Sequence, residues 1–122
     1  MLFEKAEESL KAARLCLEHQ LYNSAVSRAY YAIFQTVEAA LSDAGFHRKE
    51  WTHPGIQATF TNELIRRKKV YPPQFSRYIN RALELRIIAD YRNLSISDKQ
   101  GREATRWAEE IIQRVKERVS HG

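Results

Sequence analysis

Residues 24–45 have the sequence SAVSRAYYAIFQTVEAALSDAG, in which apolar residues recur every three or four positions. This spacing places them on one face of an α-helix, and no part of the segment alternates with the two-residue period of a strand. The segment ends at Gly45, and glycine commonly ends a helix because it adopts a left-handed backbone conformation without steric cost. The segment therefore predicts a long helix whose buried face consists of Val26, Tyr30, Ile33, Val37, Ala40 and Ala44.

A helix with one apolar face is also expected before this segment, over residues 3–19. Its inner residues are Phe3, Ala6, Leu10, Ala13 and Leu17. Tyr22-Asn23-Ser24 is expected to form the short turn between the two helices, and Asn23 or Ser24 is expected to cap the helix that follows. Two helices joined by so short a turn pack antiparallel as a hairpin.

The remaining sequence predicts three more helices. Thr52 fits the N-cap of the first, because Pro54 then falls in the first turn, where its missing N–H costs nothing. This helix is expected to end in the basic run of residues 66–69. The next helix begins at Tyr71-Pro72-Pro73 and reaches about Tyr91.

The last helix is expected to start at Ser97-Asp98-Lys99-Gln100, which has the pattern of a capping box. The chain has only four Gly and three Pro, and this scarcity disfavours a turn-rich β-sandwich or barrel. Its 122 residues are enough for one domain and too few for two. We therefore predict a single domain over residues 1–122, folded as an all-α antiparallel up-and-down helical bundle of four to five helices.

Composition excludes several other classes of protein. No apolar run approaches the ~20 residues that a membrane-spanning helix needs. The one cysteine, Cys16, cannot form a disulfide within the chain, and no spacing of His, Cys and carboxylate residues indicates a metal site. We therefore expect a cytoplasmic protein with no membrane association, no cofactor and no bound metal.

The positive charge is concentrated in one quarter of the chain. The net charge is +5, from 20 Lys and Arg against 15 Asp and Glu, and residues 62–92 alone carry eight positive and three negative side chains. Such clustering favours an anionic partner, either nucleic acid or a nucleotide phosphate. For residues 66–69, a solvated helix end is the alternative. The eight cations are Arg66, Arg67, Lys68, Lys69, Arg77, Arg81, Arg86 and Arg92.

Two charged residues interrupt the apolar face of the helix that ends near Tyr91. Ile79 and Ala82 predict further apolar residues one and two turns later, yet the chain has Arg86 and Asp90 there. These two lie four residues apart, so they share a face and can form an ion pair. Burying a charge costs several kcal/mol unless it is paired, which makes Arg86–Asp90 either a structural pair or part of a site.

Three segments resemble the small prokaryotic branch of the HEPN-domain family. They are Ser27-Arg28-Ala29-Tyr30-Tyr31-Ala32-Ile33-Phe34, then His53-Pro54-Gly55 followed by Phe60, and Glu84-Leu85-Arg86-Ile87-Ile88-Ala89-Asp90-Tyr91, which is similar to an ELRxxADY segment of one branch. The resemblance implies a helical bundle that forms a homodimer and is often encoded beside a minimal nucleotidyltransferase, as a toxin–antitoxin pair. Many members are metal-independent ribonucleases, in which an Arg holds the scissile phosphate and a His four to six residues later acts as acid or base.

The sequence departs from this nuclease pattern. No His follows Arg86 within six residues, and taking Arg92-Asn93 as the motif instead also gives no His. His53 could approach Arg86 in space, or it could simply cap its own helix. Arg28 is a further candidate, with a solvent-exposed salt bridge as the alternative. We assign no catalytic residue; the phosphate- or nucleotide-binding candidates are Arg86, Asp90, Tyr91, His53 and Arg28, and the secondary candidates are Arg92, Asn93 and Arg81.

Three functional hypotheses follow from these residues. The first is a HEPN module that binds nucleotide or RNA phosphates and pairs with a nucleotidyltransferase. The second is a metal-independent RNA-cleaving toxin that uses Arg86 with Asp90, Tyr91 or His53. The third is a structural dimerisation or docking module, in which Arg86–Asp90 is a buried ion pair. Whether the protein is an enzyme is left open by its sequence.

Overall fold

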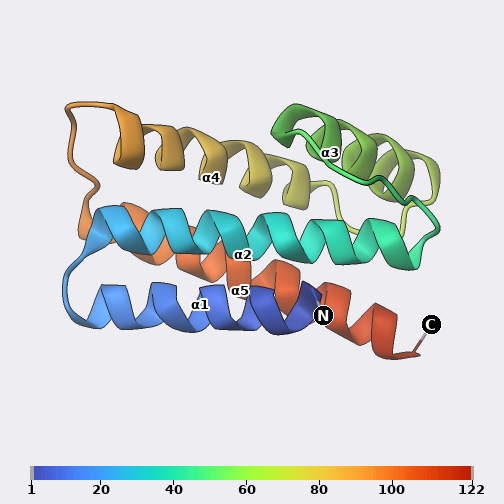
Figure 1. Cartoon of the computed structure of the whole chain (residues 1–122), viewed down its shortest axis with the longest axis horizontal. Coiled ribbons are helices and arrows are strands. Elements are labelled where there is room, and N and C mark those ends of the chain that lie inside the picture. Colours follow the sequence, from blue (N-terminus) through green and yellow to red (C-terminus); the bar gives the residue numbers. More distant parts are fainter. Residues whose placement is uncertain (1, 122) are drawn as a thin grey trace.

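The computed structural model describes residues 2–121, with side chains described for residues 3–119. All regular elements in this part of the chain are helical: α1 (Leu2–Glu18), α2 (Tyr22–Asp43), α3 (His53–Thr59), η1 (Phe60–Arg67), α4 (Gln74–Tyr91) and α5 (Asp98–His121). η1 is a π-helix that continues α3 directly, so the two form one rod. The rods α1, α2, α4 and α5 alternate in direction (Figure 1), which confirms the predicted all-α antiparallel bundle.

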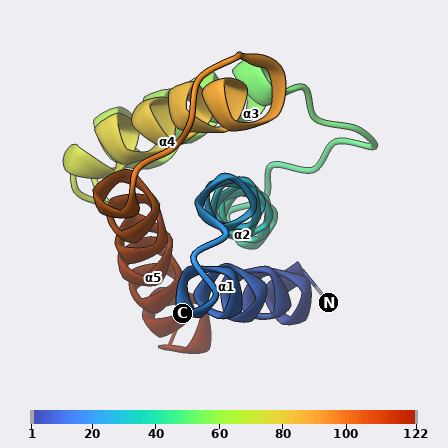
Figure 2. The ribbon, with the colours of Figure 1, turned by 90° about the vertical axis from the view of Figure 1, so that its left-hand side faces the viewer.

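α2 is the central helix of the bundle. Viewed along its axis, α1 lies on one side, α5 on a second, and the layer of α3, η1 and α4 on a third (Figure 2). The predicted inner residues of α2 are buried, except that Ala44, just past its end, is half-buried. The fourth side of α2 has no helix over it (Figure 2). Arg28, Tyr31 and Glu38 of α2 are exposed or half-buried.

The turn between α1 and α2 differs from the sequence prediction. α2 begins at Tyr22, and Leu21 occupies the N-cap position without a side-chain hydrogen bond. The prediction that Asn23 or Ser24 caps this helix was therefore wrong. Gln20 makes the turn in the left-handed conformation, with φ +60°. The side chain of Asn23 has another partner, because its Oδ1 accepts a hydrogen bond of 3.1 Å from the backbone N–H of Ile96.

The predicted N-terminal caps of two helices are confirmed. Thr52 caps α3, since its hydroxyl accepts a 3.0 Å hydrogen bond from the N–H of Gly55. Ser97 and Gln100 form a reciprocal capping box at the start of α5, with hydrogen bonds of 3.1 and 2.9 Å. These local contacts fix where α3 and α5 begin.

The end of η1 has an unusual backbone. Lys69 is left-handed, with φ +54°, and the N–H of Val70 donates a 2.9 Å hydrogen bond to the carbonyl of Leu64. Such a closing bond commonly ends a helix around a left-handed glycine, and here a lysine takes that position. Hydroxyl groups of Thr61 and Ser76 lie 3.2 Å apart and link η1 to α4. None of the helices between residues 2 and 121 is both long and apolar enough to cross a membrane.

Candidate functional site

Arg86 projects from α4 towards α2 and is mostly buried, with 14% of its side chain exposed. Its Nε donates a hydrogen bond of 3.0 Å to Oδ2 of Asp90, so the predicted pair forms. Its Nη2 donates a second bond of 3.0 Å to the hydroxyl of Tyr31, on α2. A longer contact of 3.5 Å joins the same nitrogen to the hydroxyl of Tyr91. The residue that interrupts the apolar face of α4 is therefore the centre of a polar cluster between two helices.

Three tyrosine rings surround this guanidinium. The Cζ atom of Arg86 lies 5.7 Å from the ring centroid of Tyr30 and 5.4 Å from those of Tyr31 and Tyr91. Burial opposes the positive charge, but Tyr31, Tyr91 and Asp90 outweigh that effect and raise the pKa of Arg86 above its ordinary value. The cluster therefore holds a permanent positive charge close to aromatic faces, which favour it.

Asp90 connects α4 to α2. One carboxylate oxygen binds Arg86, and the other accepts a 2.5 Å hydrogen bond from the hydroxyl of Ser27. The side chain of Asp90 is 32% exposed, so water reaches part of the pair. We call the set of Ser27, Tyr30, Tyr31, Arg86, Asp90 and Tyr91 the Arg86 cluster.

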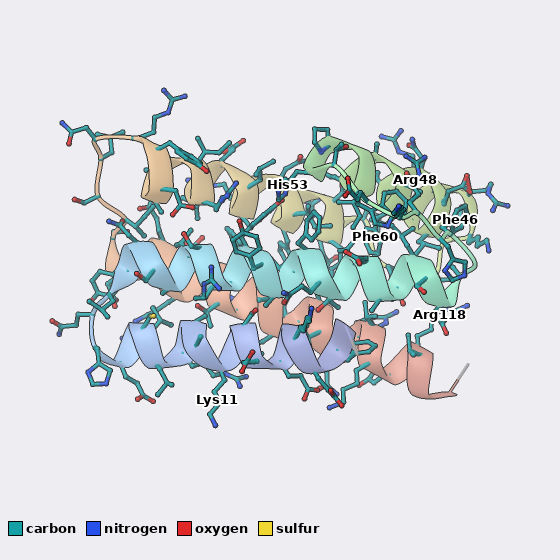
Figure 3. The ribbon with its side chains drawn as sticks, viewed as in Figure 1. Lys11, Phe46, Arg48, His53, Phe60 and Arg118 are labelled. Carbon is teal, nitrogen blue, oxygen red and sulfur yellow. The ribbon has the colours of Figure 1, made fainter. Side chains whose placement is uncertain are left out.

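His53 lies beside this cluster, at the beginning of α3 (Figure 3). Its Nδ1 is hydrogen-bonded to the hydroxyl of Tyr30. Burial raises the pKa of Tyr30 to about 12, so the hydroxyl keeps its proton. The imidazole tautomer decides which of the two groups donates in this bond. Burial and the charge of Arg86 both lower the pKa of His53, which favours the neutral imidazole.

Arg28 brings a second positive charge to the cluster. Its Cζ lies 5.0 Å from the ring centroid of Tyr31, so this ring contacts both Arg28 and Arg86. Within residues 3–119, no carboxylate lies within 4.0 Å of the Arg28 guanidinium, so the alternative of a solvent-exposed salt bridge is not found. Arg28 is exposed, and it extends the positive surface from Arg86 outwards.

Several hydrogen-bond donors of the cluster are available to an anion. Nη1 of Arg86 makes no hydrogen bond to any side chain that the structure describes. The hydroxyls of Tyr31 and Tyr91 accept bonds from Arg86, which leaves their own protons free to donate. A pocket of about 710 Å³ lies between α1, α2 and α4, and the cluster residues Ser27, Asp90 and Tyr91 line it together with Arg28. This arrangement suits a phosphate oxygen, which accepts several hydrogen bonds at once.

The structure does not bring all predicted candidates together. Arg81 is exposed on α4 and pairs with Glu84 at 2.9 Å. Arg92 and Asn93 follow α4, are exposed, and make none of the contacts that join the cluster within residues 3–119. Groups of three or more His, Cys, Asp or Glu side chains that could hold a metal are absent from the described part of the chain.

Sequence reasoning did not assign a role to Ser27, Tyr30 or Tyr31 in the site. All three belong to the α2 segment that carries the family resemblance, and they face Arg86, Asp90 and Tyr91 of the α4 segment. His53, from the third segment, contacts Tyr30. The three resembling segments therefore meet in one place, which is the signal that could have identified these residues.

Comparison with known proteins decides the family. Residues 1–118 match the HEPN domain. The chain belongs to the HEPN family. The likeness of its three segments to HEPN proteins, which the sequence indicated, is therefore confirmed.

Two similar proteins come from Methanocaldococcus jannaschii, and both are named "putative toxin". One is 32% identical over 94% of this HEPN chain and 84% of its own length. The other is 38% identical over 74% of this chain and 59% of its own length. The crystal structure of an HEPN domain protein from Thermotoga maritima has the same fold, with a TM-score of 0.71, 21% identity and coverage of 98% of this chain and 97% of that one.

The proximity of Arg86 to His53 predicts a measurable pKa change. Arg86→Gln should raise the pKa of His53, because a neighbouring positive charge disfavours the imidazolium form. In the native protein the pKa of His53 lies below its ordinary value of 6.5, so the unfolded chain binds more protons near that pH. The stability that depends on neutral His53 is complete above pH 6.5 and falls as the pH drops below it. A titration of the imidazole signals by NMR measures the shift.

Arg102→Gln is the matched control for this titration. Arg102 also pairs with an Asp four residues away, at 2.9 Å, but it lies exposed on α5. Its removal should leave the His53 titration unchanged. Equal shifts in both variants, or none in Arg86→Gln, would contradict the electrostatic coupling.

Proposed function

We propose that this HEPN protein binds the phosphate groups of RNA or of nucleotides at the Arg86 cluster. We further propose that it pairs with a minimal nucleotidyltransferase in a toxin–antitoxin system. The observation that carries the proposal is the arrangement around Arg86. A mostly buried guanidinium has one nitrogen free and contacts two tyrosine hydroxyls whose protons are free, and one of these tyrosines, Tyr91, lines an open pocket.

Charge also supports phosphate binding. Arg28 and Arg86 both contact Tyr31, whereas Asp90 is the one carboxylate that lines the adjacent pocket. Because Asp90 is already paired with Arg86 and accepts a hydrogen bond from Ser27, Arg28 is the unpaired charge that lines the pocket. Partial burial strengthens the attraction for an anion, since solvent screens the charges less.

The proposed partner and role rest on similar proteins. The two relatives from M. jannaschii carry names that describe toxins, which supports a toxin–antitoxin context for this chain. The nucleotidyltransferase partner comes from the HEPN family resemblance. A gene for such an enzyme next to the gene of this protein would favour this role over a purely structural docking module.

Arg86→Ala should weaken binding of a short single-stranded RNA or of ATP by about tenfold or more, because hydrogen bonds to a charged group contribute about 1.5–3 kcal/mol. Arg86→Lys should restore only part of this affinity, since an ammonium cannot bind Asp90, Tyr31 and a phosphate in the same planar geometry. Fluorescence anisotropy titrations measure binding, and thermal melts of the same samples give the folded fraction.

Arg102→Ala removes an equal charge from another Arg–Asp pair and should change binding by less than about twofold. Arg86→Ala should leave most of the fold intact, because Ser27 still binds Asp90 and water reaches its carboxylate. A large loss of stability with unchanged affinity, after correction for the folded fraction, would show that Arg86 is a structural residue only.

RNA cleavage is the second candidate function, and the environment of His53 argues against it. The His that follows the Arg in the nuclease motif is absent from this chain, and the hydroxyl of Tyr30 occupies Nδ1 of His53. We therefore expect purified protein to bind a single-stranded RNA and leave it intact in a gel assay with EDTA. Cleavage that disappears in both Arg86→Ala and His53→Ala would instead establish a metal-independent RNA-cleaving toxin.

We also propose that the protein forms a homodimer through the end of α4. Tyr91 and Leu94 are large apolar residues that are 70% and 66% exposed, and Ile87 and Ile88 are only half-buried. Exposed apolar residues grouped in this way favour a protein–protein contact. Their position beside Arg86 would place two clusters near each other across the interface.

Light scattering should accordingly give the mass of a dimer for the native protein. Leu94→Asp should shift it towards the monomer, since a carboxylate would have to be desolvated in the interface. Ala58→Asp, which adds the same charge at an exposed position of α3, should leave the mass unchanged. A monomeric native protein at high concentration would rule out this dimer.

A further inference from the structure

A second positively charged pocket lies at the opposite end of α4. It has a volume of about 730 Å³ and forms where η1 ends and α4 begins, against α5. Arg66 and Lys69 line it from η1 and the following turn, Arg77 from α4, and Arg114 from α5. We infer that this η1–α4 pocket is a separate binding site for a ligand that carries several phosphate groups.

The η1–α4 pocket differs in charge balance from the groove between α1 and α5. The four cations that line it face no lining carboxylate, and within residues 3–119 none of them forms an ion pair. A groove of about 1010 Å³ between α1 and α5 shares Arg114 with the pocket and is lined by four cations and four glutamates. Two of its ion pairs are Arg14–Glu109 at 3.3 Å and Lys116–Glu7 at 2.6 Å. Like charges that converge without compensation repel one another, and a bound anion relieves that repulsion.

The backbone of η1 selects which residues of the basic run reach the pocket. Arg67 pairs with Glu63 at 2.6 Å, and the Nζ of Lys68 lies 5.6 Å from the ring centroid of Phe46. Arg66 and the left-handed Lys69 line the pocket instead. The alternative of a solvated helix end therefore fits the middle two residues of the run, whereas the outer two converge with cations from two other helices.

The other lining residues suit the same chemistry. Thr61 and Ser76 line the pocket and are hydrogen-bonded to each other, so one hydroxyl proton of the two stays free for a phosphate oxygen. Val70, Pro72 and Pro73 add an apolar wall, which a ribose or base can contact. Several cations with one apolar wall match a nucleoside triphosphate or successive phosphates of an RNA strand, and both sources present the same phosphate chemistry.

Helix geometry separates this pocket from the Arg86 cluster. Arg77 and Arg86 are nine residues apart on α4, which corresponds to about two and a half turns, so they project from opposite sides of the helix. The two sites have no lining residue in common. The η1–α4 pocket can therefore be tested independently of the function proposed for Arg86.

The experiment compares three variants for binding of tripolyphosphate, ATP and a short single-stranded RNA. Lys69→Gly/Arg77→Ala removes two cations from the pocket. Glycine adopts the left-handed backbone of position 69 without strain, so the substitution there should not lower the melting temperature. Arg14→Ala/Lys116→Ala removes the same charge from the balanced groove. Arg86→Ala reports on the other site.

The pocket variant should lose about tenfold or more in affinity for a phosphate ligand, and the groove variant about twofold or less. Loss of ATP binding identifies a free nucleotide as the source, and loss of RNA binding alone identifies a strand.

Equal losses in both double variants, or complete loss of phosphate binding in Arg86→Ala alone, would overturn the inference. So would poly-aspartate that binds the pocket as tightly as RNA does, because it would indicate an acidic protein segment. Unchanged binding in Arg86→Ala with loss in the pocket variant would refute the function proposed for Arg86 and leave this inference intact.

Discussion

The candidate site depends on how the carboxylate of Asp90 is held. It accepts hydrogen bonds from Ser27 on α2 and from Arg86 on α4, so one side chain fixes how the two helices meet. The guanidinium of Arg86 is mostly buried, and a buried charge is tolerated when it is paired and hydrogen-bonded. Because Asp90 binds Nε of Arg86, it also orients the guanidinium between three tyrosine rings and leaves Nη1 free.

A structural ion pair and a binding site are usually treated as alternatives, but Arg86 can be both. A guanidinium has five N–H groups, and the contacts to Asp90 and to the tyrosines use only those on Nε and Nη2. The bonds that stabilise the helix pair thus hold the free nitrogen in a fixed position. Little conformational entropy then remains to be lost when an anion binds, which favours affinity.

Those features that depend on local spacing could be predicted from the sequence. The apolar periodicity gave the helices, Thr52 and Ser97 gave two of the caps, and Arg86 and Asp90 were found because they interrupt an apolar face. Contacts such as Ser27–Asp90, 63 residues apart, depend on which faces of α2 and α4 meet, and periodicity does not specify that. The turn at Gln20 was missed because its left-handed conformation occurs in a residue type that rarely adopts it.

The π-helix η1 has a consequence for how this protein tolerates changes in length. Each hydrogen-bonded loop of a π-helix contains one more residue than a loop of an α-helix. η1 therefore accommodates an additional residue without adding a helical turn. Phe60 and Leu64 remain in the core while Arg66 reaches the pocket. Deletion of a single residue within η1 would convert one of its wide turns to an ordinary α-helical turn and so leave the residues after it on the same face. Homologues that are one residue shorter here are therefore expected to keep both the core and the alignment of the basic residues.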